Sequence, residues 1–296
     1  MYKISICGHF GGNKKFCDGQ TVKTKNLYNA LKEYYGEEKI KILDTYDWKR
    51  HPFNFFLKCI KATRNSKNII LLPAHNGVNI VIPLFTILKR IFDVKVFYIV
   101  VGGWLPKLLE KKIWLKRYIK KLDKIFVETN NMKAKLEKQN ISNVDILVNF
   151  KELRQLTKEE LCYKITIPYK LCTFSRVIEK KGIEDAINVI KDINDNEKKI
   201  RYILDIYGPI DEIYKNRFEN LVENFPEYIN YKGCIAPNES VEVLRNYYCL
   251  LFPTKFKTEG IPGTIIDAYA AGIPVIASKW DNANEVICDG ITRLYI

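Results

Sequence analysis

The stretch Thr258–Ser278 reads T-E-G-I-P-G-T-I-I-D-A-Y-A-A-G-I-P-V-I-A-S, a glycine-rich loop followed by a helix-like and a strand-like segment. Gly260 and Gly263 bracket the predicted turn. The pattern then favours a helix over Thr264–Ala271, and the apolar run Pro274–Ala277 is typical of a buried strand. Repeated units of this kind build a parallel sheet that is covered by helices on both faces.

The same stretch has the chemistry of an anion site. Backbone N–H groups of a glycine-rich turn and of a helix N-terminus point at a bound anion. Thr264 could cap the helix or donate a hydrogen bond to a phosphate. Glu259 and Asp267 are eight residues apart, with Asp267 expected in the first helical turn, and could reach opposite ends of one ligand. The alternative interpretation is a capped helix after an ordinary strand.

Strand-like and helix-like segments alternate along the rest of the chain. The strands predicted in residues 1–150 are Lys3–Cys7, Lys39–Leu43, Asn68–Leu72, Val94–Val101, Lys124–Val127 and Val144–Val148. The helices predicted between them are Thr21–Tyr35, Pro52–Asn65, Val78–Phe92, Leu105–Leu122 and Asn130–Lys138. The alternation stops over residues 151–168, a polar segment interpreted as a linker, and restarts in residues 169–296. The further strands are Leu171–Ser175, Tyr202–Tyr207, Tyr228–Lys232 and Cys249–Phe252, and the further helices are Gly182–Ile193, Asp211–Asn224 and Asn238–Tyr247.

The fold class expected from this alternation is α/β, with two Rossmann-like, doubly wound parallel-sheet domains that face a cleft. The N-terminal domain is expected over residues 1–150 and the C-terminal domain over residues 169–296. Ligands of open α/β sheets bind at the carboxyl ends of the strands, so the cleft is the expected site.

Composition excludes several other classes of protein. The chain has 296 residues, of which 47% are hydrophobic and 28% are charged, as in an ordinary globular protein rather than a disordered one. No run reaches the ~18 uninterrupted apolar residues of a membrane span. None of the eight cysteines forms a C-x-x-C pair, which favours buried thiols over a disulfide framework or a zinc site.

The formal net charge of +14 is confined to the first half of the chain. Residues 1–150 contain 28 Lys and Arg against 12 Asp and Glu, whereas residues 151–296 contain 20 against 22. A basic half could face nucleic acid, an anionic membrane or an acidic substrate.

One basic segment is also amphipathic. Leu105–Lys124 carries eight Lys or Arg residues together with Trp114 and a stripe of apolar residues, a pattern found in helices that lie on anionic membranes. In the alternative that we favour, the stripe packs on the domain's own sheet and the charged face orients the protein at a membrane. No recognised nucleic-acid motif is present.

A second candidate stretch, Phe174–Gly182, follows a predicted strand and opens a helix. Arg176 and Lys181 are five residues apart at the carboxyl end of that strand and could clamp a diphosphate, Arg through its planar fork and Lys as a point charge. The alternative is that both are solvated surface residues.

Together, the two stretches resemble the retaining glycosyltransferases of the two-domain GT-B fold, in particular glycosyltransferase family four (group 1 glycosyl transferases). The resemblance covers essentially the whole chain and is stronger in its second domain. The matching residues are Arg176, Lys181, Glu259, Gly260, Asp267, Ala268, Gly272, Pro274, Ser278, Glu285 and Gly290.

The resemblance implies roles for these residues. Arg176 and Lys181 would hold the donor diphosphate and stabilise the leaving-group charge, and Glu259 would approach the sugar hydroxyls; these three are the predicted catalytic residues. Asp267, one methylene shorter than the family's usual Glu, would bind the ribose. The backbone of Gly260, Ile261, Pro262, Gly263 and Thr264 would cradle phosphate and sugar, and the turn Gly233–Cys234 would meet the base.

In the first domain, the loop entering the first helix resembles the family's glycine-rich loop. Gly19 and Gln20 would approach the diphosphate, although Asp18 or Thr21 could equally be the N-cap of the helix. The acceptor-side candidates are His9, Gly12, His75 and Gly103. Many relatives have a His near Gly102 and Gly103, so this chain supplies no catalytic His there. His75 could instead be a hydrogen-bonded loop residue.

The resemblance implies sugar transfer with retention from a nucleotide-sugar, UDP-linked for example, to a saccharide or lipid-linked acceptor. It implies no cofactor and no metal, since no D-x-D follows a strand. The expected partners are the nucleotide-sugar, the acceptor and the anionic inner membrane surface, with no nucleic acid. The expected setting is cytoplasmic, peripheral to the membrane, in bacterial capsule, lipopolysaccharide or other surface-polysaccharide synthesis. Relatives continue for several helices beyond G-I-T-R-L-Y-I, so truncation is expected, and the rivals are an inactive binding or partner subunit and a sugar-nucleotide epimerase.

Overall fold

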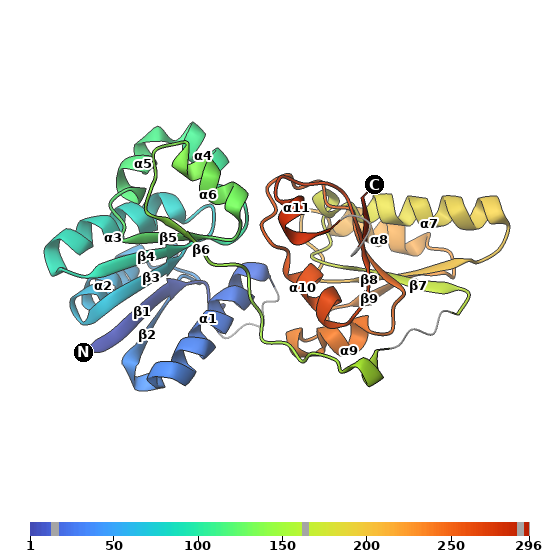
Figure 1. Cartoon of the computed structure of the whole chain (residues 1–296), viewed down its shortest axis with the longest axis horizontal. Coiled ribbons are helices and arrows are strands. Elements are labelled where there is room, and N and C mark those ends of the chain that lie inside the picture. The colour runs from blue at the N-terminus through green and yellow to red at the C-terminus, as the bar shows by residue number, and fades with distance from the viewer. Residues whose placement is uncertain (13–17, 162–165, 289–292, 296) are drawn as a thin grey trace. The chain divides into compact units, whose positions relative to one another are not determined.

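The computed structural model describes residues 1–12, 18–161, 166–288 and 293–295, the last three for their backbone only. The chain divides into two compact units, Met1–Lys151 and Glu152–Ile296. Each unit is built around one six-stranded sheet in which every pair of neighbouring strands is parallel (Figure 1). The expected α/β fold with two doubly wound sheets is confirmed.

The sheet of the N-terminal unit has the strand order β2-β1-β3-β4-β5-β6. Its strands are β1 (Tyr2–Gly8), β2 (Ile40–Asp44), β3 (Ser66–Leu72), β4 (Lys95–Ile99), β5 (Lys124–Val127) and β6 (Val144–Ile146). The helices of this unit are α1 (Gly19–Tyr35), α2 (Pro52–Arg64), α3 (Val78–Phe92), α4 (Leu105–Lys111), α5 (Ile113–Ile119) and α6 (Asn130–Glu137), with the short 3-10 helix η1 (Glu37–Lys39).

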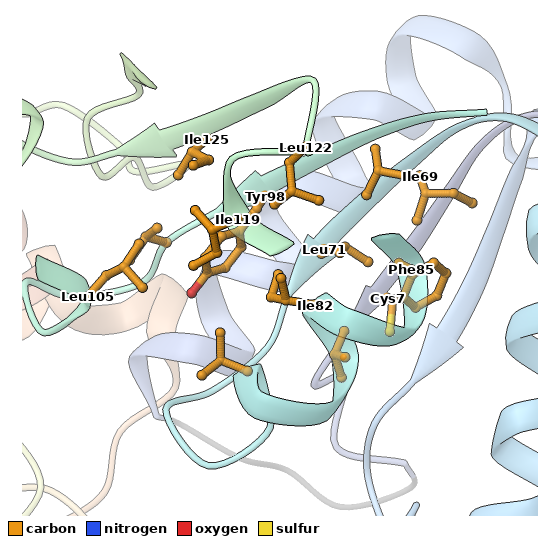
Figure 2. Packing of buried hydrophobic residues seen from close by; sticks show 14 of the residues in the cluster. Cys7, Ile69, Leu71, Ile82, Phe85, Tyr98, Leu105, Ile119, Leu122 and Ile125 are labelled. Atoms are coloured by element: carbon orange, nitrogen blue, oxygen red, sulfur yellow. The ribbon is translucent and has the colours of Figure 1, made fainter. Parts of the chain in front are cut away.

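The two faces of this sheet carry separate hydrophobic clusters. Ile82 and Phe85 of α3 pack with Cys7, Ile69 and Leu71 of the sheet in the larger cluster, which also takes in α2, α4, α5 and α6 (Figure 2). The apolar residues of α1 pack on the other face in a smaller cluster. The helix that follows β1 and the helix that follows β3 therefore cover opposite faces.

The single helix predicted over Leu105–Leu122 is wrong, because the structure divides it into α4 and α5. Lys112 leaves the helical region at φ −118° and ψ 71°, and its ammonium donates to Asn79 Oδ1 at 3.0 Å. The apolar stripe is buried on the sheet, as the favoured alternative has it: Leu108, Leu115, Ile119 and Leu122 are all core residues. The apolar periodicity runs through Lys112, so it could not show the break.

The sheet of the C-terminal unit has the order β12-β11-β10-β7-β8-β9. Its strands are β7 (Tyr169–Phe174), β8 (Tyr202–Tyr207), β9 (Ile229–Gly233), β10 (Cys249–Phe252), β11 (Val275–Ala277) and β12 (Arg293–Tyr295). Its helices are α7 (Ile183–Glu197), α8 (Lys215–Glu223), α9 (Ser240–Leu244), α10 (Gly263–Ala270) and α11 (Ala283–Val286). The short 3-10 helices are η2 (Lys158–Glu160), η3 (Glu179–Lys181) and η4 (Pro237–Glu239).

Residues at the start of this unit pack against it. Leu153 and Leu156 contact the cluster formed by α9 and α10. Arg154 pairs with Glu242 at 2.5 Å and also with Glu160. The part of the expected linker that the structure describes up to Leu161 is thus held against the C-terminal unit.

Gly182 lies where the loops after β7 and β10 approach each other closely. It has φ 69°, and a Cβ placed on it would lie 2.0 Å from the carbonyl oxygen of Pro253. Gly233 has nearly the same φ, 72°, but a Cβ placed there meets nothing within 4 Å. The two glycines share a left-handed backbone, and only Gly182 adds a steric requirement.

We expect Gly182→Ala to destabilise the protein more than Gly233→Ala. Both variants bear the cost of a left-handed Ala, about 1–2 kcal/mol. Only Gly182→Ala adds a clash with backbone, worth a further ~1–3 kcal/mol. Urea unfolding of both variants measures the difference, and equal losses of unfolding free energy would contradict the close approach.

Candidate functional site

The C-terminal unit has its topological switch point between β7 and β10, neighbouring strands whose following helices cover opposite faces of the sheet. In open α/β sheets such a point leaves a crevice at the carboxyl ends of the two strands. The loop after β7 holds Arg176 and Lys181, and the loop after β10 holds Glu259 to Pro262. The two loops are joined by a hydrogen bond from Lys255 N–H to Lys180 O at 2.8 Å.

Lys181 and Glu259 form an ion pair across these loops. The distance from Lys181 Nζ to Glu259 Oε1 is 2.5 Å, and the side chains are 16% and 18% exposed. The hydroxyl of Thr254 donates to the same carboxylate oxygen at 3.1 Å. The ammonium also lies 5.1 Å from the centre of the Phe252 ring. The pair is shielded by aromatic rings yet still reachable from solvent, which suits a ligand that carries both charge and hydroxyl groups.

Side chains from beyond β11 hold the backbone of this loop. Asn282 Nδ2 donates to Glu259 O at 2.6 Å, and Trp280 Nε1 donates to Gly260 O at 3.2 Å. Sequence reasoning missed both residues, as well as Thr254. The segment that contains Asn282 was singled out for Glu285 and Gly290 instead; Glu285 is exposed, and Gly290 lies outside the described residues.

Helix α10 begins at this loop without a side-chain cap. Its N-cap, Pro262, accepts from the N–H groups of Ile265 and Ile266, and the N–H groups of Gly263 and Thr264 precede these bonds. The hydroxyl of Thr264 is buried and has no hydrogen-bond partner among the described residues. The side chain therefore does not cap the helix, and its donation to a phosphate stays a prediction. The backbone N–H groups of Gly263 and Thr264 are the groups positioned to bind an anion.

The other predicted donor residues differ in their surroundings. Arg176 is half exposed, with Nη1 3.8 Å from Asp211 Oδ2. Asp267 lies in the second turn of α10, is 1% exposed and accepts from Ser240 Oγ of α9 at 3.1 Å. The turn Gly233–Cys234 ends β9, and Cys234 is exposed.

The N-terminal unit has its own switch point between β1 and β3. His9 follows β1, and its Nδ1 lies 2.7 Å from Thr21 Oγ1. The Thr21 hydroxyl donates to Asp18 Oδ2 at 2.7 Å, so His9 Nδ1 must carry a proton and donate to Thr21. Asp18 is the N-cap of α1, the alternative that the sequence left open. The predicted Gln20 donates from Nε2 to Leu72 O at 2.9 Å.

The remaining acceptor-side candidates lie at the same edge of the sheet. Gly12 N–H donates to Asp44 Oδ2 at 2.8 Å, and Gly103 is buried in the loop after β4. His75 is exposed after β3, and its ring packs edge-on against Trp104 with 5.0 Å between centroids. A Cβ placed on Gly19 would meet no atom of the described residues within 4 Å.

A buried ion pair supports this edge and was missed from the sequence. Lys23 of α1 and Glu128 after β5 are 2.5 Å apart and 2% exposed each. Glu128 Oε1 also accepts from Gly102 N–H at 3.4 Å. Loss of one partner of such a pair typically costs about 3–5 kcal/mol, because the other charge stays buried. The pair therefore ties α1 to the loop that carries Gly103.

In the part of the chain that the structure describes, no three His, Cys, Asp or Glu side chains gather in a group that could hold a metal ion. The expected independence from metal remains a prediction.

Sequence comparison finds a family model and relatives that match parts of the chain. Residues 168–296 match the family model for glycosyl transferases group 1. The chain is 26% identical over 165 residues, 54% of its length, to alpha-monoglucosyldiacylglycerol synthase of Streptococcus pneumoniae. It is 26% identical over 127 residues, 41% of its length, to the putative colanic acid biosynthesis glycosyltransferase WcaL of Salmonella typhimurium. These alignments cover 36% and 30% of the two relatives, so the chain spans about a third of their length.

Structural comparison covers the whole chain. Sucrose-phosphate synthase of Thermosynechococcus elongatus has a TM-score of 0.75 at 15% identity, over 100% of this chain and 86% of that one. HepE of Anabaena in complex with UDP and glucose has a TM-score of 0.70 at 11% identity, again over 100% and 86%. At such identities the likeness concerns the fold. The chain therefore has the GT-B fold, and residues 168–296 match the family model for the group 1 glycosyl transferases.

Proposed function

We propose that the protein is a retaining glycosyltransferase that moves a sugar from a nucleotide-sugar to a saccharide or lipid-linked acceptor. The observation that carries this proposal is the Lys181–Glu259 pair beside the uncapped start of α10. A cation, an anion-binding helix end and a carboxylate meet at one switch point. These are the groups that a diphosphate joined to a sugar requires.

In this proposal each group has a task. A diphosphate bound at the start of α10 draws the ammonium of Lys181 towards its oxygens and away from Glu259. Glu259 then accepts hydrogen bonds from the sugar hydroxyls. Arg176, half exposed at the neighbouring strand end, turns from Asp211 towards the phosphate. Cations held at the leaving group stabilise the negative charge that develops there as the glycosidic bond breaks.

Retention places the acceptor on the same face of the sugar as the leaving phosphate, and that phosphate takes the acceptor's proton. No protein base is then needed. No cofactor and no metal take part in the proposal.

The relatives support the choice of substrates. The structure of HepE contains UDP and glucose, which favours a UDP-linked donor. The name of the pneumococcal relative denotes synthesis of a glycolipid, and WcaL is named for colanic acid biosynthesis. We place this protein accordingly in bacterial surface-polysaccharide synthesis, capsule and lipopolysaccharide included, on the cytoplasmic side of the membrane and peripherally bound to it.

Removal of the proposed phosphate ligands tests the donor site. We expect Lys181→Ala and Arg176→Ala to weaken binding of a nucleoside diphosphate by about 10- to 100-fold each, since a hydrogen bond to a charged group contributes about 1.5–3 kcal/mol. Transfer from a panel of UDP-, GDP-, ADP- and CMP-linked sugars should fall in parallel. Lys215→Ala, an exposed Lys on α8, is the control and should change neither quantity.

Titration calorimetry gives the affinity and product analysis gives the rate. If both variants bound the nucleoside diphosphate as tightly as the wild type does, Lys181 and Arg176 would not be its phosphate ligands. Normal nucleotide-sugar affinity of the wild type without any turnover would instead favour a binding protein.

Thiol labelling tests whether the turn after β9 meets the donor. Burial raises the pKa of Cys172 well above its usual value and that of Cys249 to about 12, so neither should be alkylated at pH 8. Cys234 and Cys288 are exposed and should react. Peptide mapping with and without UDP should show protection of Cys234 alone; equal labelling under both conditions would place the nucleotide elsewhere.

Chelation tests the proposed independence from metal. We expect transfer to keep its rate after treatment with EDTA, because the positive charge at the leaving group comes from Lys181 and Arg176. The rate should also be unchanged on addition of Mg²⁺ or Mn²⁺. Loss of activity that either ion restores would contradict the proposal.

A further inference from the structure

Helices α2 and α3 lie side by side and expose large apolar side chains. Six of these residues make up what we call the α2–α3 apolar surface: Phe53, Phe56, Leu57, Ile80, Ile87 and Ile91. Each is between 44% and 74% exposed. Scattered apolar residues are ordinary on protein surfaces, whereas a patch of this kind marks an interaction site.

The geometry of α2 turns its three residues outwards. Phe55, Cys59 and Ala62 face the sheet and are buried. Asn54, Lys58 and Lys61 line a groove of about 950 Å³ that follows the free side of β2. At 100° per residue, Phe53 and Leu57 point away from the sheet, and Phe56 lies opposite the groove, on the side of α3.

The geometry of α3 completes the surface. Ile80, Ile87 and Ile91 follow one another at spacings of seven and four residues, which places them on one stripe of the helix. Asn79 marks the side of α3 that meets α5, because it accepts from Lys112 at 3.0 Å. The isoleucine stripe lies about a quarter turn or more from Asn79, outwards and towards α2. An amphipathic surface helix would carry polar residues there.

The charge around this surface is predominantly positive. Residues 48–122 contain 16 Lys and Arg against two acidic residues, a surplus equal to the net charge of the entire chain, +14. No Asp or Glu occurs between Trp48 and Phe92, the segment that supplies all six apolar residues. Arg64 ends α2 and Arg90 lies near the end of α3, and both are exposed.

We propose that the α2–α3 apolar surface inserts into the interfacial region of an anionic membrane, with the surrounding cations on the lipid headgroups. Apolar side chains ringed by Lys and Arg are the combination that binds such an interface. A nucleic acid would use the cations but not the phenylalanine and isoleucine side chains. Protein interfaces are poor in Lys, which argues against a protein partner.

In this proposal α2 and α3 contact the membrane, rather than the segment Leu105–Lys124. The sequence predicts membrane contact by Leu105–Lys124, but the apolar stripe of that segment is buried in the core. Its exposed large apolar residues are Ile113 and Trp114. Within the described residues no helix is long and apolar enough to cross a membrane. The α2–α3 apolar surface also begins near the expected acceptor site, since Ile80 lies five residues after His75. The link to a lipid-borne acceptor rests on the proposed function; the membrane contact does not.

The test compares two serine variants of the full chain. Phe56→Ser/Ile87→Ser/Ile91→Ser removes half of the α2–α3 apolar surface. Val189→Ser/Ile213→Ser removes two exposed apolar residues from the C-terminal unit and serves as the control. All substituted side chains are exposed, so both variants should melt at the temperature of the wild type and bind UDP as it does.

Binding is measured by co-sedimentation with vesicles of 30% phosphatidylglycerol in phosphatidylcholine and with vesicles of phosphatidylcholine alone, without donor or acceptor. We expect the wild type and the control to bind the anionic vesicles, and the triple variant to bind at least tenfold more weakly. Salt should weaken the binding of all three. If the triple variant bound the anionic vesicles as tightly as the wild type does, the proposal would be overturned.

A second outcome would also overturn it. If the wild type sediments as a dimer without vesicles and the triple variant as a monomer, the surface joins two copies of this chain. Because no transfer reaction enters either measurement, a failure of the membrane contact and a failure of the proposed transferase activity are told apart.

Discussion

The candidate site depends on the close approach of two loops. The carbonyl of Pro253 occupies the space where any residue other than Gly at position 182 would place its Cβ. Lys181 is thereby held one residue from the contact, and Lys255 N–H bonds to the carbonyl of Lys180. Without this approach the ammonium of Lys181 and the carboxylate of Glu259 would have no reason to meet, because they are 78 residues apart in the chain.

Much of the fold follows from patterns that are local in the sequence. Alternating strands and helices predict parallel sheets, and the carboxyl ends of parallel strands gather Arg176, Lys181 and the loop before α10 at one edge. Local patterns miss what depends on distant backbone. Asn282 and Trp280 donate to the carbonyls of Glu259 and Gly260, which lie 23 and 20 residues earlier, and no pattern in the neighbouring sequence indicates these contacts.

Some predicted residues lie in surroundings that differ from those expected from the sequence. In each case tertiary packing determines these surroundings. Asp267 was placed in the first turn of its helix as a ribose ligand, yet it lies in the second turn against Ser240 and is closed to solvent. The break at Lys112 is equally invisible to periodicity, since the apolar stripe continues on both sides of it. The charge of the basic half cannot be assigned to the surface from the sequence either. Lys23 belongs to this half, but it is buried in an ion pair with Glu128.

The pairing of Lys181 with Glu259 has a consequence for selectivity. Without a ligand, the charges of Lys181 and Glu259 cancel each other. The pair therefore offers little attraction to free phosphate, sulfate or other simple oxyanions. Such an ion could take the ammonium only by stranding a carboxylate. A compound that brings hydroxyl donors along with its phosphates can satisfy both partners at once. Glu259 therefore competes with the ligand for Lys181. Only a ligand with both phosphate and hydroxyl groups can replace this ion pair and still leave both side chains paired.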